Sequence, residues 1–218
     1  MNYTYRTDLY KTVLYILLFT VAMAYVESAL VVVLRELFYP TGFEFPLKDI
    51  PSWMMLMEAG RELATILMLI VVAALAARRF WRRFGFFLLM FGVWDIFYYS
   101  WLKLLIGWPT SWTDWDLFFL IPVPWVGPVI APITVSIVMV VVGTSIISLF
   151  HAKLEFRPTR FSWIMAMAAT AAILYSFMAD YELILRQEEP RGYNYVLLGI
   201  GLLLYLIGYI HAYRRAAA

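Results

Sequence analysis

Long apolar segments alternate with short polar ones along the chain, and this pattern predicts the fold. Each apolar segment approaches or exceeds the roughly 20 residues with which a helix crosses the hydrocarbon core of a bilayer. We expect transmembrane helices over Thr12–Phe38, Trp53–Ala77, Phe84–Ile106, Val129–Phe150, Phe161–Met178 and Tyr195–Tyr213. The pattern therefore predicts an all-α, polytopic integral membrane protein, in which residues 1–218 form a single transmembrane domain built as a bundle of six helices.

One apolar segment, Leu117–Pro132, does not fit this pattern because it contains four prolines. Proline lacks a backbone donor and disfavours the helical conformation of the residue before it. We therefore expect Ile121–Trp125 to be extended or partly re-entrant, ahead of the fourth helix. A tryptophan-rich loop, Gly107–Asp116, precedes it. The two stretches together either form a lid over the acidic residues described below or belong to an aromatic belt at the membrane interface.

Composition supports the membrane class and excludes several chemistries. The chain is 64% apolar and 15% charged, whereas soluble domains average about 45–50% and about 25%, and its mean hydropathy is +0.78. The absence of cysteine excludes disulfides, a thiolate nucleophile and iron–sulfur clusters. No haem or nucleotide-binding motif is found. A net charge of +2 gives no reason to expect a nucleic-acid partner.

Basic residues gather on one side of the predicted membrane. This side carries Arg6, Lys11, the Arg78–Arg83 turn, Lys153, Arg157, Arg160, Arg214 and Arg215. Cytoplasmic loops are enriched in Lys and Arg, and an even number of spans returns the chain to the side where it began. We therefore expect a multi-pass protein with both termini in the cytoplasm.

Acidic residues inside the predicted spans are the strongest functional signal. Glu58 and Glu62 are four apart, so a helix places both on one face, with Arg61 beside them. Glu62 lies one turn deeper than Glu58, about 6 Å further into the membrane. Glu27 and Asp95 fall near the middle of the first and third spans. Charges at such depths are costly unless they face protein or water, so we expect these side chains to meet in an outward-facing pocket.

The pocket hypothesis assigns a role to each candidate residue. The candidate catalytic acids are Glu27, Glu62 and Asp95. The candidate ligands of a divalent metal ion, which favours oxygen donors, are Glu27, Glu58, Glu62 and Asp95. The candidate rim residues are Arg61, Tyr98, Tyr99 and Asp180. Two ionised carboxylates 4 Å apart repel by about 4 kcal/mol at an effective permittivity of about 20, so a proton, an arginine or a bound cation must offset the repulsion.

Arginine side chains could offset the repulsion between the carboxylates in place of a bound cation. Arg61 is expected to reach Glu58 and Glu62 on its own helix but to be badly placed for Glu27 and Asp95 if those two lie deeper in the membrane. If Arg35 and Arg61 form ion pairs with all of these acids, the acids only stabilise the packing of the helices and bind no ligand.

Three classes of function stay open at this stage. The leading hypothesis is a small membrane protein whose carboxylate pocket binds a cation or metal, or an enzyme acting on a lipid-like or amphipathic substrate. The second is a proton- or cation-coupled transporter, and the third is an accessory subunit of a larger membrane complex. The expected partners are the bilayer, a lipid-like or cationic small molecule, and further copies of the chain or other subunits.

Overall fold

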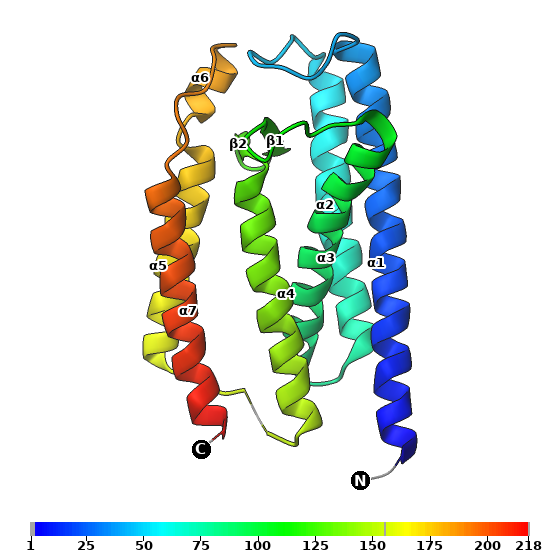
Figure 1. Cartoon of the computed structure of the whole chain (residues 1–218), viewed down its shortest axis with the longest axis vertical. Helices are drawn as coiled ribbons and strands as arrows, with labels where there is room; N and C mark the ends of the chain where they lie inside the picture. The colour runs from blue at the N-terminus through cyan, green and yellow to red at the C-terminus, as the bar shows by residue number, and fades with distance from the viewer. Residues whose placement is uncertain (1–2, 155, 218) are drawn as a thin grey trace.

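The protein is a bundle of long helices, in a computed structural model that describes residues 3–154 and 156–217. The helices are α1 (Tyr3–Phe38), α2 (Ser52–Ala76), α3 (Phe80–Ile106), α4 (Ile130–His151), α5 (Arg160–Met178), the short α6 (Tyr181–Leu185) and α7 (Tyr195–Ala217) (Figure 1). Within the described residues, six helices are long and apolar enough to cross a membrane. The predicted six-helix membrane bundle is confirmed. The predicted single domain also includes residues 1, 2, 155 and 218, which lie outside the described residues.

The proline-rich segment forms a short β-hairpin. Strands β1 (Trp115–Phe119) and β2 (Trp125–Pro128) pair antiparallel, with Asp116 opposite Gly127 and an irregularity after Leu117. The prediction that this segment is not helical was right. The stretch Ile121–Trp125 was expected to be extended or partly re-entrant. Most of that stretch is the bend between the strands, and β2 begins only at its last residue. Because proline lacks a backbone N–H, it interrupts the hydrogen bonds between strands as well as those of a helix. The pairing of the strands therefore resumes only beyond Pro124.

Helix α3 is the centre of the larger group of helices, because α1, α2 and α4 all pack along it. Helices α5 and α7 form a second pair, which joins the first group mainly where α7 meets α4 and where α5 meets β2. Glycine allows close contacts between these helices. A Cβ added to Gly143 of α4 would lie 2.6 Å from the carbonyl oxygen of Gly85 in α3. Small residues at such crossings let the backbones of membrane helices approach one another.

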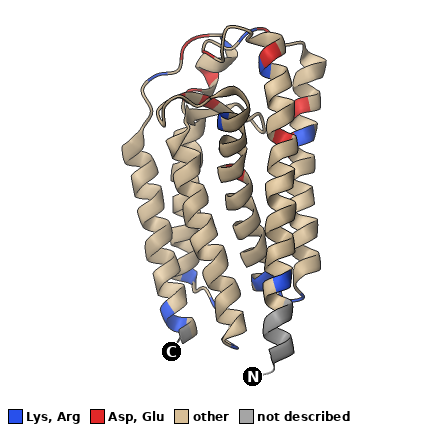
Figure 2. Ribbon diagram, turned by 45° about the vertical axis from the view of Figure 1, so that its right-hand side comes forward, with Lys and Arg blue, Asp and Glu red and all other residues tan. Residues whose placement is uncertain are grey.

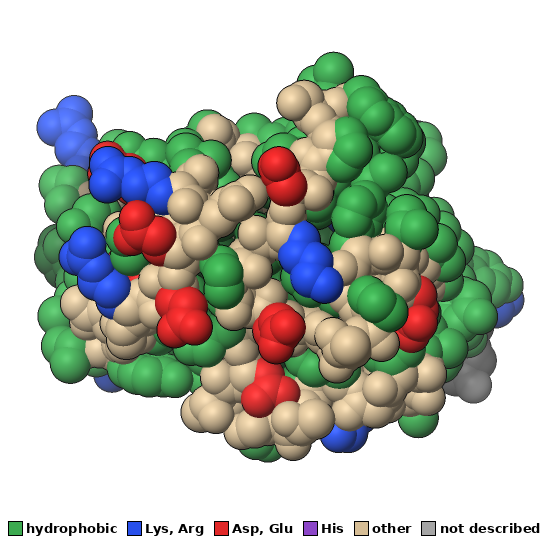
Figure 3. Space-filling view, turned by 90° about the horizontal axis from the view of Figure 1, so that it is seen from above, with side chains coloured by type: hydrophobic (Ala, Val, Ile, Leu, Met, Phe, Trp, Pro, Cys, Tyr) green, Lys and Arg blue, Asp and Glu red, His purple; other side chains and the backbone are tan. Residues whose placement is uncertain are grey.

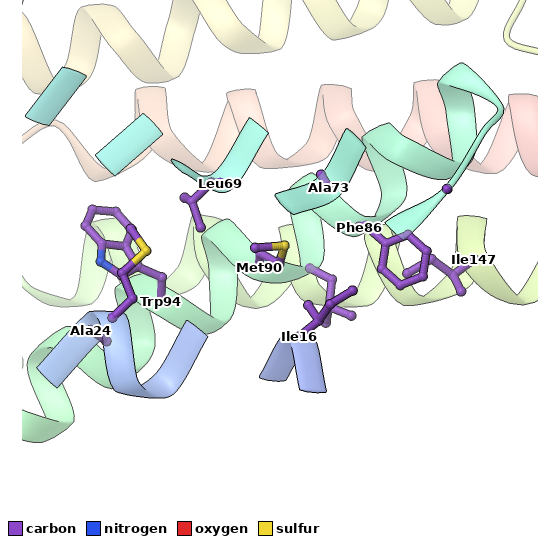
Figure 4. Close-up of a cluster of buried hydrophobic side chains, with 11 residues drawn as sticks. Ile16, Ala24, Leu69, Ala73, Phe86, Met90, Trp94 and Ile147 are labelled. Atoms are coloured by element: carbon purple, nitrogen blue, oxygen red, sulfur yellow. The ribbon is translucent and has the colours of Figure 1, made fainter. Parts of the chain in front are cut away.

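A cluster of buried apolar side chains fills the half of α1–α4 nearer the two termini (Figure 4). Ile16 of α1, Leu69 of α2 and Ile147 of α4 pack with Phe86 and Met90 of α3. Leu69, Phe86 and Met90 are fully buried. This cluster makes one half of the four helices a close-packed core.

The two ends of the bundle differ in charge. Both termini lie at one end (Figure 1), where Lys and Arg gather, while most Asp and Glu lie in the opposite half (Figure 2). We call these the basic end and the acidic half. Seen from above, the far face carries charged side chains of both signs among hydrophobic ones (Figure 3). The prediction that the protein is multi-pass agrees with the six helices, and the cytoplasmic position of the basic end stays a prediction.

Candidate functional site

A cavity of about 450 Å³ lies in the acidic half of the bundle, between α1–α4 on one side and α5–α7 on the other. Its lining starts at Glu27 on α1 and ends at Thr65 on α2, and on α4 it extends from Pro132 to Met139. The β-hairpin forms part of its wall through residues 116–120, Pro124 and Trp125. The cavity is therefore confined to the half of the bundle away from the termini.

The three candidate catalytic acids all line this cavity. Glu27 and Asp95 each precede the end of their helix by 11 residues, and Glu62 follows the start of α2 by 10, which places each about 15–17 Å from that end at 1.5 Å per residue. Glu27 is 5% exposed and Glu62 is 7% exposed. Three helices therefore present one carboxylate each at a similar depth, and those of Glu27 and Glu62 are buried.

Arg61 bridges two of the acids. Its guanidinium contacts the Glu27 carboxylate on α1 and donates from Nε to Oε2 of Glu58, 2.9 Å away, on its own helix. Glu27 also accepts a hydrogen bond from the hydroxyl of Thr65, so α1 and α2 lie side by side here.

The expectation that Arg61 is badly placed for Glu27 was wrong. Arg61 follows the start of α2 by 9 residues, and Glu27 precedes the end of α1 by 11, so their depths differ by only about 3 Å. The flexible arginine side chain spans that difference easily.

Glu62 ties the hairpin to α2. Both of its carboxylate oxygens accept from the backbone N–H of Leu120, at 3.0 and 2.9 Å. Leu120 lies in the bend between β1 and β2, so the hairpin covers this carboxylate. Of the two interpretations of the proline-rich stretch, this geometry favours a cover over the acids.

Asp95 sits where α3 and α4 approach most closely. Its Oδ2 accepts from the hydroxyl of Ser136, 2.7 Å away on α4. A Cβ on Gly92, one turn earlier on α3, would collide with the backbone carbonyl of Ser136, so glycine is needed for this contact. The hydrogen bonds of Glu62 and Asp95 thus come from neutral donors, whereas Glu27 and Glu58 contact Arg61 directly.

Three of the four candidate rim residues line the cavity, and Asp180 does not. Arg61, Tyr98 and Tyr99 line the cavity, but Tyr99 is only 4% exposed and forms part of the wall. Asp180 is not among the described residues that line the cavity; it accepts from the backbone N–H of Arg191 at 2.6 Å and holds the connection after α6.

A second buried ion pair was missed by the sequence analysis. Nη2 of Arg35 lies 2.7 Å from Oδ1 of Asp116 in β1, and the guanidinium carbon lies 3.8 Å from the ring centre of Trp108 and 4.4 Å from that of Phe43. Burial raises the pKa of Asp116, and the positive charge of Arg35 opposes that rise. The available signal was an acid inside an apolar stretch, between Trp115 and Leu117.

The charges on the cavity wall do not balance. Six acids line it against three bases, an excess of three negative charges when all are ionised. The acids are Glu27, Asp49, Glu58, Glu62, Asp95 and Asp116, and the bases are Arg35, Lys48 and Arg61. Among the described residues, no group of three or more His, Asp or Glu is arranged to hold a metal ion. The metal site proposed from the sequence gains no support from this arrangement and stays a prediction.

Comparison with protein-family models, curated proteins and solved structures found no match for this chain.

Proposed function

We propose that this protein binds an amphipathic molecule with a positively charged head group inside the membrane. The observation that carries the proposal is the cavity itself, in which an excess of carboxylates faces a largely apolar space between membrane-length helices. A cationic head group offsets the excess negative charge, and buried charges are stable only when they are paired or neutralised.

The head group is expected beside Glu62 and Asp95, because their hydrogen bonds come from the Leu120 N–H and the Ser136 hydroxyl and not from cations. Aromatic rings stand close to this position. The ring of Phe119 lies 6.4 Å from that of Trp94 and 5.3 Å from that of Trp125, and all three residues line the cavity. Carboxylates next to aromatic faces suit an alkylammonium or a quaternary ammonium group.

The opposite wall suits a hydrocarbon chain. Ile173, Leu174 and Phe177 of α5 face the cavity together with Met139 of α4. The cavity volume of about 450 Å³ falls within the range of about 300–1,000 Å³ that is usual for small-molecule sites. An apolar chain here and a cation at the carboxylates describe one amphipathic ligand.

The same residues offer proton transfer as their chemistry. Asp95 and Glu62 are buried acids next to a candidate ligand head, and a carboxyl group within hydrogen-bond reach of a substrate can act as a general acid or base. The proposed binding protein could therefore also be a membrane enzyme. Catalysis would need a substrate whose reacting atom lies beside these two carboxyl groups.

The apolar cluster of α1–α4 favours a one-sided site over the transporter. It lies between the cavity and the basic end, where Ile16, Leu69 and Phe86 pack together. Alternating access would require this packed region to open to the other side of the membrane. An accessory subunit would use the acids only as structural pairs, which fits Arg35 with Asp116 better than it fits Glu62 and Asp95.

A series of ligands with one chain length tests the proposal. Affinities of the purified protein in nanodiscs would be measured for a long-chain alkylammonium, its quaternary analogue, the neutral alcohol and the sulfonate. We expect the two cations to bind at least tenfold more tightly than the alcohol, and the sulfonate to bind least. Equal affinity for the cations and the alcohol would refute the assignment of the head group.

A further inference from the structure

The two walls of the cavity come from helices that do not pack extensively on one another. Helix α2 packs along α3, and α5 packs along α7, while α2 and α5 are not among the extensively packed pairs. The cavity is lined from the first side by Met54 and Met55 of α2, and from the second by Leu174 of α5 and Leu185 of α6. The space between α2 and the α5–α6 segment is therefore part of the cavity.

The end of the cavity that faces away from the termini is partly covered by folded chain, and the exposed residues Lys48, Asp49 and Gln187 also line the cavity there. The connection between α1 and α2 contributes Tyr39, Phe43 and Leu47 to the lining. It is held by a hydrogen bond from the Lys48 N–H to the Tyr39 hydroxyl, at 2.8 Å, and by the contact of Phe43 with the Tyr39 ring, at 5.0 Å between centroids. The hairpin is fixed beside it by the two bonds from Leu120 to Glu62.

Apolar residues of α2 and α6 line the cavity near the ends of these helices that face away from the termini. Met55 is 39% exposed and Leu185 is 60% exposed, although both line the cavity. Their segments, Ser52–Ala76 and Arg160–Leu185, are each long enough to cross a bilayer. Met55 is the fourth residue of its segment and Leu185 is the last of its own, so both lie near the membrane interface. Leu174 of α5, eleven residues before Leu185, lines the cavity deeper in the span.

We infer that the cavity opens sideways into the bilayer between α2 and the α5–α6 segment, and that its ligand is a membrane lipid whose chain leaves through this opening. The assignment of a cationic head group to that lipid rests on the proposed function. The inference of a sideways opening rests only on the helix packing and the lining residues. A lipid that arrives through the side keeps its chain in hydrocarbon throughout. A water-borne amphiphile would instead enter through the partly covered end.

Site-specific quenching of a fluorophore tests the opening. The chain has no cysteine, so one introduced cysteine carries one label, placed at Met139→Cys on α4 or at Leu174→Cys on α5. The full-length protein would be reconstituted into vesicles in which part of the phospholipid has brominated chains, which quench by contact. Iodide in the water would serve as the aqueous quencher.

Two labelled positions outside the cavity calibrate the signal. Leu75→Cys, at a residue that is 83% exposed on α2, gives the full effect of the lipid quencher. Glu182→Cys, at a side chain that is 64% exposed beyond α5, gives the full effect of iodide. We expect both cavity labels to show at least half the lipid quenching of the label at position 75, and less than a fifth of the iodide quenching of the label at position 182.

Strong iodide quenching of the cavity labels, or protection from both quenchers, would overturn the sideways opening. The proposed function can fail separately. Lipid quenching at both cavity positions without any preference for a cationic ligand would leave the opening intact and remove the head-group assignment. Displacement of the brominated lipid by a long-chain alkylammonium, seen as a loss of quenching at position 139, would support both.

Discussion

The two halves of helices α1–α4 are built from the same helices but in opposite ways. Near the termini, Leu69, Phe86 and Met90 are fully buried among apolar neighbours, and Gly85 and Gly143 bring α3 and α4 into contact. In the acidic half, the same helices carry carboxylates, arginines and a cavity. Close packing alone can stabilise helices without any buried charge. This difference fits the proposal that the acidic half contains the binding site, while the other half stabilises the bundle.

The two arginines of the acidic half, Arg35 and Arg61, have different surroundings. Arg35 is 7% exposed and lies between an acid and two aromatic rings, so its charge is used within the protein. Arg61 is shared by Glu27 and Glu58 and lines the cavity. We expect Arg35 to matter for stability and Arg61 to matter for the potential inside the cavity.

Replacing Arg35 should have the largest effect on stability. Arg35→Met keeps much of the side-chain packing but leaves Asp116 buried without its partner. Breaking a buried pair in this way costs about 4 kcal/mol, measurable as a loss in the free energy of unfolding in detergent. The double variant with Asp116→Asn should recover most of the loss. A single variant as stable as the wild type would show that this pair is not structural.

The Arg35→Met deficit should also depend on pH. The pKa of Asp116 is raised above 3.8 in the folded protein, so the folded state holds this proton more tightly than the unfolded state does. Its contribution to stability therefore falls as pH rises above about 4. Because loss of Arg35 raises that pKa further, the deficit should grow from pH 4 towards pH 7. A deficit that does not change with pH would contradict this.

Crowding the packed half should have the next largest effect. In Gly143→Leu, the Cβ would lie 2.6 Å from the carbonyl oxygen of Gly85 and 2.7 Å from the N of Leu89, both backbone atoms of α3. Overpacking of this kind costs about 2 kcal/mol, read from the unfolding transition. Gly199→Leu on α7 is the matched control, because a Cβ there meets no atom within 4 Å. Equal stability of the two variants would show that α3 and α4 are not in close contact.

The sequence predicted the helices well because each apolar segment is long enough to be recognised by itself. It also identified Glu27, Glu62 and Asp95 as acids inside spans. The hairpin was missed because its strands contribute only five and four residues, too few for a distinct alternation. The pairs Arg35–Asp116 and Arg61–Glu27 were missed because they join different elements of the chain. Helix depth limits such contacts, but it does not show which helices are neighbours.

The proposed function requires that the carboxylates of the cavity bind a cationic head group. The direct measurement is the affinity of a long-chain alkylammonium for the protein in nanodiscs, compared between wild type, Glu62→Gln with Asp95→Asn, and Glu182→Gln. We expect the cavity variant to lose affinity at least tenfold, about 1.4 kcal/mol, with a free energy of unfolding no lower than that of the wild type. The exposed Glu182 variant should bind normally, since its pairing with Arg186 is a surface contact of 3.9 Å. Unchanged affinity in the cavity variant would contradict the account.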